Sequence, residues 1–231
     1  MSGDGSGPVG AASTLAAEPI VRWDWVTDHL DDVWARTIEH VRLTVIAVVV
    51  GFAIALVLAT IAVRYRRAYR PITWVAGLLY TIPSAALFGL LIPYTGLGLL
   101  TAEIALVSYT LLVLVRNIVA GVDGVPASVR EAATAMGYTP MRRFVRVELP
   151  LAVPAIVAGL RIASVTTIGL VTVTSLIGQG GYGAFILDGL RRQFPTPTLL
   201  GIVLSAGLAT VVDLAFVAVQ RRLIPWERAR V

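Results

Sequence analysis

The 231-residue sequence contains no cysteine and no lysine, and only 14% of its residues are charged. Without cysteine the chain has neither disulfides nor thiolate metal ligands. Without lysine it cannot supply the side chain that a Walker A loop places on nucleotide phosphates, so any ATP hydrolysis must come from another chain. Soluble domains carry roughly 25% charged residues, and the low fraction here excludes an ordinary soluble protein.

Histidine is scarce as well, since only His29 and His40 occur and both lie near the N-terminus. Their position argues against histidine-assisted hydrolysis inside a membrane. We expect both side chains on the polar face of an N-terminal helix. The sequence therefore predicts no catalytic residue and no metal site, and the chain is not expected to be an enzyme by itself.

Hydrophobic residues make up 57% of the chain. They gather in runs of about 20 residues, the length that crosses a hydrocarbon core of ~30 Å. Backbone polar groups in lipid must be paired within the segment, which favours helices. We predict an all-α polytopic membrane protein with one five-span domain over residues 43–220. The spans are expected at residues 43–63, 72–92, 97–115, 155–177 and 199–219.

The basic residues, all 19 of them arginine, orient these spans. Thirteen lie in the connection after the first span, in the connection after the third span and after the fifth span; five lie on the opposite side. The positive-inside rule then predicts a cytoplasmic C-terminus and an external N-terminus, in the inner or plasma membrane of a cell. Arginines placed between spans do not form a nucleic-acid footprint, so we expect the lipid bilayer and no nucleic acid as a partner.

Two segments flank the predicted domain on its N-terminal side. Residues 1–22 are rich in glycine, alanine and serine, and we predict a disordered extracytoplasmic tail there. Residues 23–42 carry apolar side chains at helical spacing together with three tryptophans. This pattern predicts an amphipathic helix at the outer membrane interface, with a soluble extension of the first span as the alternative. Residues 221–231 are expected to form a cytoplasmic tail.

The longest polar interval between spans, residues 126–150, predicts a helix–turn–helix unit on the cytoplasmic face. Pro126 suits the first turn of a helix, Gly137 suits the left-handed position that ends it, and Thr139-Pro140 suits the start of a second helix. A solvated connector, a DNA-reading helix-turn-helix and a docking element for a cytoplasmic partner are the alternatives. Spans lie close on both sides of the unit, which disfavours the DNA reader.

This loop resembles the EAA loop in the permease subunits of binding-protein-dependent ABC importers of the type I fold. The residues that match are Glu131, Ala132, Ala133, Gly137, Val147, Leu149 and Pro150, with Val147 standing where isoleucine is commonest. The resemblance implies that the loop sits in a groove of an ATPase subunit, with Glu131, Ala133 and Gly137 as contact and shape residues. It also implies no cofactor in this chain, ATP and Mg²⁺ in the partner ATPase, a second permease subunit (a paralogue or a second copy) and an extracytoplasmic solute-binding protein.

Two further segments are similar to the osmoprotectant permeases of this family. Residues 81–88 and 91–98 resemble the region between their second and third spans. Residues 177–183 resemble their outer loop, although methionine-type permeases share that feature. The resemblance implies glycine betaine, carnitine, choline or proline as the solute. A permease for another small amino-acid-like solute, of the methionine type, is the alternative.

Three charged residues fall inside the predicted spans, where charge is expensive and usually functional. Arg161 and Asp213 lie at a similar depth, about 9 Å from the cytoplasmic ends of their spans, and we predict that they pair, with a structural or gating role. Glu103 lies nearer the outer side and is expected on the pathway or at a subunit interface. If the chain were instead an ion-coupled secondary transporter, Glu103 or Asp213 would carry the ion; a membrane scaffold would need neither.

Four uncharged residues complete the candidates for the pathway or an interface. Pro83 lies in the middle of the second span and is expected to kink it. Thr167 and Thr174 belong to a hydroxyl-rich fourth span, where they either line the pathway or hydrogen-bond between helices. Tyr94 offers an aromatic face of the kind that attracts quaternary ammonium groups.

Overall fold

The computed structural model describes residues 20–223, and within this range the chain is helical and contains no strand. The predicted tails over 1–22 and 221–231 therefore lie almost wholly outside the described residues. The helices are α1 (Trp23–Asp28), α2 (Leu30–Arg64), α3 (Arg66–Thr81), α4 (Ser84–Thr95), α5 (Leu99–Asp123), α6 (Ala127–Ala135), α7 (Pro140–Arg143), α8 (Leu149–Val173), α9 (Gly183–Arg192) and α10 (Pro195–Leu223). A π-helical turn over Phe144–Glu148 joins α7 to α8, and a 3₁₀ turn over Thr174–Ile177 follows α8.

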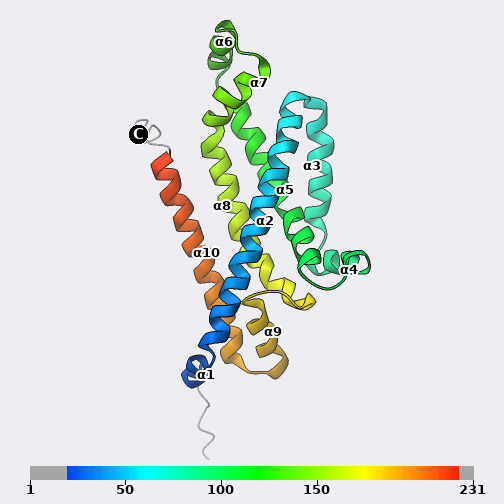
Figure 1. Cartoon of the computed structure of the whole chain (residues 1–231), viewed down its shortest axis with the longest axis vertical. Coiled ribbons are helices and arrows are strands. Elements are labelled where there is room, and N and C mark those ends of the chain that lie inside the picture. The colour runs from blue at the N-terminus through cyan, green and yellow to red at the C-terminus, as the bar shows by residue number, and fades with distance from the viewer. Residues whose placement is uncertain (1–19, 224–231) are drawn as a thin grey trace, which may run out of the picture.

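The long helices confirm the predicted all-α polytopic architecture. Four helical segments are long and apolar enough to cross a membrane: Leu30–Arg64, Leu99–Asp123, Pro140–Ile177 and Pro195–Arg222. The bent pair α3–α4 supplies a fifth if it counts as one span. Figure 1 shows the long helices side by side, with α6 and α7 at one end of the molecule and α1 and α9 at the other.

The second span departs from the prediction, because residues 72–92 do not form one helix. Helix α3 ends at Thr81, α4 begins at Ser84, and the two are bent by 99°. Proline has no amide hydrogen, and it forces the preceding residue away from the helical conformation. Ile82 accordingly has φ −66° and ψ 127°. The kink expected at Pro83 is therefore a break, and Figure 1 shows α4 leaving the bundle sideways.

The predicted helix over 23–42 also has different boundaries in the structure. Only Trp23–Asp28 forms a helix of its own, and from Leu30 onward the chain belongs to α2, continuous with the first span. No glycine or proline interrupts residues 30–42, so nothing in the sequence ends the helix before the membrane. The short α1 is anchored by Trp25, whose ring meets Phe185 and Phe194 edge-on at centroid distances of 6.2 and 5.8 Å.

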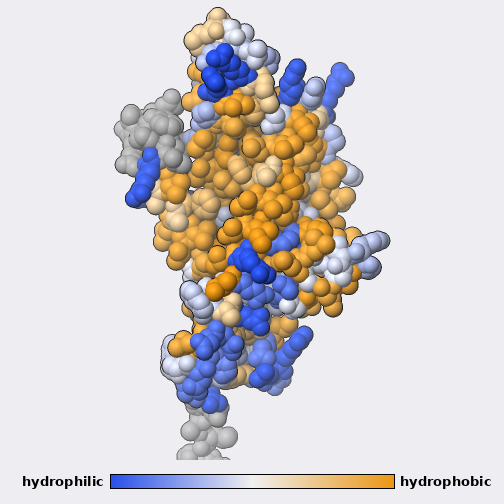
Figure 2. All heavy atoms as spheres, viewed as in Figure 1, coloured by the Kyte–Doolittle hydropathy of each residue, from blue (hydrophilic) through white to orange (hydrophobic). Residues whose placement is uncertain are grey.

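The core lies among α2, α5 and α8, with one apolar cluster along the N-terminal half of α5 and a second along its C-terminal half. Glycines let these helices approach closely, as small residues do in membrane proteins generally. A Cβ atom added to Gly159 of α8 would lie 2.6 Å from the Asn117 Cβ of α5, and one added to Gly121 would lie 3.0 Å from the Ala152 Cβ. Figure 2 shows apolar side chains over the middle of the molecule and hydrophilic ones at its two ends.

Candidate functional site

The loop between α5 and α8 forms the helix–glycine–helix unit that the sequence predicts. Helix α6 ends at Ala135, and Gly137 follows with φ 79°, a left-handed conformation that glycine adopts at no steric cost. The Tyr138 amide returns to the Ala133 carbonyl at 3.2 Å. Thr139 then caps α7, its hydroxyl accepting a bond from the Arg142 amide at 3.4 Å. Figure 1 shows this unit projecting beyond the ends of α5 and α8.

The motif residues of this loop divide into an outer and an inner set. Glu131, Ala132 and Gly137 are exposed, whereas Ala133 is 1% exposed and packs inward. Of the remaining motif residues, Val147 and Leu149 are half-buried and Pro150 is exposed. The tip also presents apolar surface, because Met136 and Met141 are 68% and 62% exposed. The α6–α7 loop therefore packs against the bundle through Ala133 and exposes a partly apolar tip at Met136 and Met141.

A buried carboxylate holds the base of the loop, and sequence reasoning did not single it out. Glu148 is 4% exposed and lies in the π-helical turn that leads into α8. Its Oε1 accepts a hydrogen bond from the Nε of Arg143 at 2.9 Å and lies 3.9 Å from the Nε of Arg130. Arg143 also donates to the Thr134 hydroxyl at 3.0 Å. One side chain thus connects α6, α7 and α8.

Arg130 extends the same network to α5. Its Nη2 donates to the backbone carbonyls of Val122 and Asp123 at 2.9 and 3.0 Å, where α5 ends and its last carbonyls lack helical partners. Asp123 in turn forms a two-pronged ion pair with Arg66 at the start of α3; one prong measures 2.8 Å. The loop is therefore connected to the adjacent ends of α5 and α8, and the Arg66–Asp123 pair joins α5 to α3 beside it.

The structure brings together the two charged residues predicted to pair inside the membrane. Arg161 of α8 donates to Asp213 of α10 through both Nε and Nη2, the second at 2.7 Å from Oδ2. Both side chains are partly exposed, at 39% and 31%. The pair lies at the contact between α8 and α10, on the surface of the single chain. It fastens α10, which otherwise packs mainly against α9 and one side of α8.

Three of the other intramembrane candidates, Glu103, Thr167 and Thr174, are buried within the single chain, and their place on a pathway or at a subunit interface stays a prediction. Glu103 is 9% exposed, and neither of its carboxylate oxygens has a hydrogen-bond partner among the described residues. Thr167 and Thr174 are 1% and 0% exposed, and the Thr174 hydroxyl donates to the Val171 carbonyl. Tyr94, by contrast, is 83% exposed at the end of α4.

The expectation that both histidines lie on a polar face is wrong for His40. Its ring is fully buried, with Nε2 3.1 Å from the Ile168 carbonyl of α8 and Nδ1 accepting a bond from the Tyr182 amide at 3.3 Å. The glycine turn before Tyr182 makes this approach possible. Gly181 has φ 49°, and an added Cβ would lie 2.5 Å from the His40 Cβ. His40 therefore connects α2 to α8 and to the loop that precedes α9.

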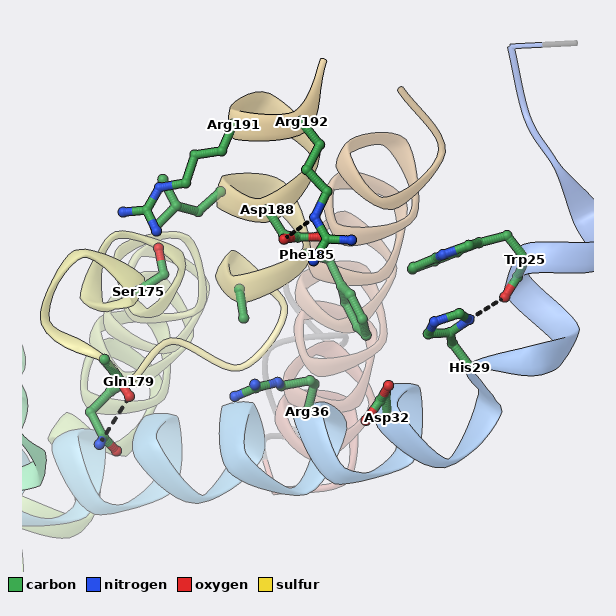
Figure 3. Close-up of a pocket in the computed structure, with 13 residues that line it drawn as sticks. Trp25, His29, Asp32, Arg36, Ser175, Gln179, Phe185, Asp188, Arg191 and Arg192 are labelled. Atoms are coloured by element: carbon green, nitrogen blue, oxygen red, sulfur yellow. Dashed lines mark hydrogen bonds and ion pairs between the residues drawn. The ribbon is translucent and has the colours of Figure 1, made fainter. Parts of the chain in front are cut away.

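A polar hollow of about 480 Å³ opens at the end of the molecule opposite the α6–α7 loop. Its walls come from α1, the start of α2, the glycine turn and α9. Figure 3 shows Trp25 and His29 stacked at one end of the hollow and Arg191 at the other, with Asp32 between them on α2. Arg192 pairs with Asp188 at 2.8 Å. The hollow thus combines aromatic faces with charges of both signs.

Comparison with known protein families matches residues 38–225 to the model described as "Binding-protein-dependent transport system inner membrane component". The match covers the spans, the α6–α7 loop and α9. The chain belongs to this family. It is accordingly a multi-pass inner membrane permease component that works with a binding protein, as the resemblance in the α6–α7 loop implied.

Individual relatives in this family carry names that state a solute. The chain is 35% identical to the choline transport system permease OpuBB of Bacillus subtilis, covering 82% of this chain and 88% of the relative. It is 36% identical to the carnitine transport permease OpuCB of Listeria monocytogenes, covering 82% and 87%. It is 35% identical to the osmoprotectant import permease OsmW of Salmonella typhimurium, covering 82% and 90%.

Solved structures confirm the fold of this permease family. The inward-facing MetNI methionine ABC transporter superposes with a TM-score of 0.74 at 22% identity, covering 88% of this chain and 99% of that chain. An amino acid ABC transporter superposes with a TM-score of 0.73 at 17% identity, covering 87% and 99%. At these identities the likeness concerns the fold alone.

Two features of this permease escaped the sequence analysis, although each leaves a signal. Helix α9 was not predicted, yet it carries apolar residues on one side and ends in Arg191 and Arg192, where basic residues favour a helix C-terminus. Glu148 lies between Val147 and Leu149 of the motif, and it follows Arg142, Arg143 and Arg146. An acidic residue shortly after several arginines is the signal of an ion pair.

Proposed function

We propose that this permease is the membrane subunit of an ATP-driven importer of compatible solutes with a quaternary ammonium group, such as choline, carnitine or glycine betaine. The observation that carries the proposal is the similarity over 82% of the chain to permeases named for choline and carnitine. A relative named for osmoprotectant import adds support. A solute of the methionine type has only the fold likeness in its favour, since the MetNI match has 22% identity.

The α6–α7 loop is the surface on which a cytoplasmic ATPase subunit would dock. Its exposed tip combines the Glu131 carboxylate with the apolar side chains of Met136 and Met141. The ATPase would bind ATP and Mg²⁺, because this chain contains no lysine for a phosphate-binding loop. ATP-driven movement of the ATPase would reach the spans through Glu148 and Arg130, which connect the loop to α5 and α8.

This assignment orients the molecule. The end with the α6–α7 loop also carries the arginines of the α2–α3 connection, so it would face the cytoplasm under the positive-inside rule. The end with α1 and α9 would face outward, toward the solute-binding protein. The hollow between these helices, with its aromatic and charged walls, is a suitable contact surface for that partner.

A second permease subunit, either a paralogue or another copy, completes the proposed path. The outward face of α10 is apolar and unpaired in the single chain, with Val203, Val211 and Leu214 at 60% exposure or more. Such a face requires lipid or another subunit. The Arg161–Asp213 pair would hold α10 in the position from which it meets that neighbour.

Co-purification and reconstitution test the proposal. The tagged permease is purified gently from its native membrane and analysed for a bound ATPase and binding protein. After reconstitution, ATP inside the vesicles is expected to drive uptake of radiolabelled choline, carnitine or glycine betaine but not of methionine. Methionine uptake would reject the solute class. Uptake by the permease without any ATPase would reject the importer mechanism in favour of an ion-coupled carrier.

A further inference from the structure

A shallow hollow of about 660 Å³ lies between α3 and α5, on the side of the bundle away from α10. Arg70, Pro71, Thr73 and Trp74 of α3 line it, together with Arg116 of α5. The Thr73 hydroxyl is already used, since it donates to the Tyr69 carbonyl at 2.8 Å. The two arginines therefore supply the free polar groups of the hollow, and proline and tryptophan supply its apolar wall.

The hollow lies close to the end of the molecule that carries the α6–α7 loop. The ion pair between Arg66 and Asp123 marks that end, because it joins the first residue of α3 to the last residue of α5. Counted along the helices, Arg70 lies about 6 Å and Arg116 about 10 Å closer to the bilayer centre than this pair. Tryptophan is enriched at the membrane–water interface, so Trp74 indicates that the hollow lies near the lipid headgroups.

The charge of this hollow is unbalanced. Among residues 20–223, neither Arg70 nor Arg116 takes part in an ion pair, and no acidic side chain lines the hollow. By contrast, Arg161 of α8 has a carboxylate partner in Asp213. A guanidinium at a membrane boundary attracts anionic lipid headgroups, and a phosphate matches its planar fork of donors.

We propose that this hollow binds an anionic phospholipid of the leaflet on the α6–α7 side, with the phosphate between Arg70 and Arg116 and an acyl chain against Pro71 and Trp74. The occupant has to be amphiphilic, because the cationic rim and the apolar wall belong to the same hollow. Basic pockets between membrane helices on the cytoplasmic side favour such headgroups. A bound lipid would connect α3 to α5. This site lies toward the C-terminal end of α5, where Arg130 of the α6–α7 loop donates to the Val122 carbonyl.

Lipid retention by the intact transport complex tests this site. The complex is purified in detergent containing equal amounts of phosphatidylglycerol and phosphatidylcholine, washed repeatedly and analysed by native mass spectrometry. The wild type is expected to retain phosphatidylglycerol in preference to phosphatidylcholine. Each of Arg70→Gln and Arg116→Gln is expected to lower that retention about five-fold, and the double variant roughly 25-fold. Trp74→Ala is expected to shorten retention while leaving the preference for the anionic headgroup.

Arg222→Gln is the matched control, because Arg222 is exposed at the same end of the molecule but does not line the hollow. It is expected to retain lipid like the wild type. Equal retention by the double variant and the wild type would overturn the proposal, and so would equal retention of the two lipids by the wild type. If a second permease subunit covered the hollow, the wild type would retain no phosphatidylglycerol there. That result would also reject the proposed lipid site. None of these outcomes depends on which solute is transported.

Discussion

The carboxylate of Glu148 accepts a hydrogen bond from Arg143 at 2.9 Å while its side chain is almost completely buried beneath the α6–α7 loop. Arg130 approaches the same oxygen from α6 and caps the end of α5. Glu148 therefore positions the docking loop relative to two membrane helices. The exposed residues of the loop form its outer surface, and this buried charge connects the loop to the bundle.

Replacing Glu148 by glutamine is expected to loosen this connection without removing the docking surface. The change leaves Arg143 and Arg130 without their carboxylate partner, and we expect it to lower the stability of the folded protein by roughly 2 kcal/mol. This cost is below that of breaking a fully buried ion pair, because the Arg143 side chain is 29% exposed. The measurement is the ratio of ATP hydrolysed to solute imported, which is expected to rise while the ATPase still co-purifies. Arg146→Gln, an exposed neighbour, serves as the control. An unchanged ratio in Glu148→Gln would contradict the positioning role.

Substitutions at Gly137 separate the shape of the loop from its contacts. An added Cβ meets no atom within 4 Å, so the cost of a side chain lies in the left-handed backbone alone. Gly137→Ala is expected to cost about 1 kcal/mol, and Gly137→Asn less, because asparagine tolerates this conformation. Gly137→Asp keeps the conformation but adds charge to the docking face, so we expect the weakest ATPase binding there. Equal ATPase binding by the Asn and Asp variants would show that this face makes no contact.

The ion pair between Arg161 and Asp213 is expected to be needed for assembly. Either Arg161→Gln or Asp213→Asn leaves a charge without its partner inside the apolar belt, and the yield of assembled complex is expected to fall several-fold. The exchange Arg161→Asp with Asp213→Arg restores opposite charges at the same contact. Recovery of yield and uptake in the exchanged variant is the expected result. Failure of the exchange, with normal behaviour of both single variants, would remove the pair from the assembly mechanism.

The buried carboxyl of Glu103 is expected to be dispensable for transport. Both oxygens lack hydrogen-bond partners within residues 20–223, so replacement by methionine removes unsatisfied polar groups and is expected to stabilise the complex by about 1–3 kcal/mol. Glu103→Gln keeps polar atoms there and is expected to change the thermal midpoint little. Thermal melting and solute uptake are measured for both. Loss of uptake in both variants would indicate that the carboxylate carries an ion, as an ion-coupled transporter requires.

The membrane class, the approximate spans and the docking loop were predictable, because each depends on local properties of the chain. Runs of apolar residues predict the helices α2, α5, α8 and α10. Gly137, Thr139 and Pro140 predict the turn between α6 and α7. The continuous helix from Leu30 matches the alternative, an extension of the first span, and not the separate interfacial helix, since a change in polarity does not end a helix. The break at Pro83 was expected only as a kink, because the depth of a proline bend depends on what packs beside it.

The sequence by itself determined that this is a membrane permease without its own ATPase, through its apolar runs, its missing lysine and its spaced loop motif. Only the tertiary structure decided which charges meet. Asp213 lies 52 residues from Arg161, and His40 lies 142 residues from Tyr182, yet both pairs are in contact. Such contacts depend on how the helices rotate about their axes when α5 packs between α2 and α8. Apolar periodicity constrains that rotation weakly in a chain that is hydrophobic on nearly every face.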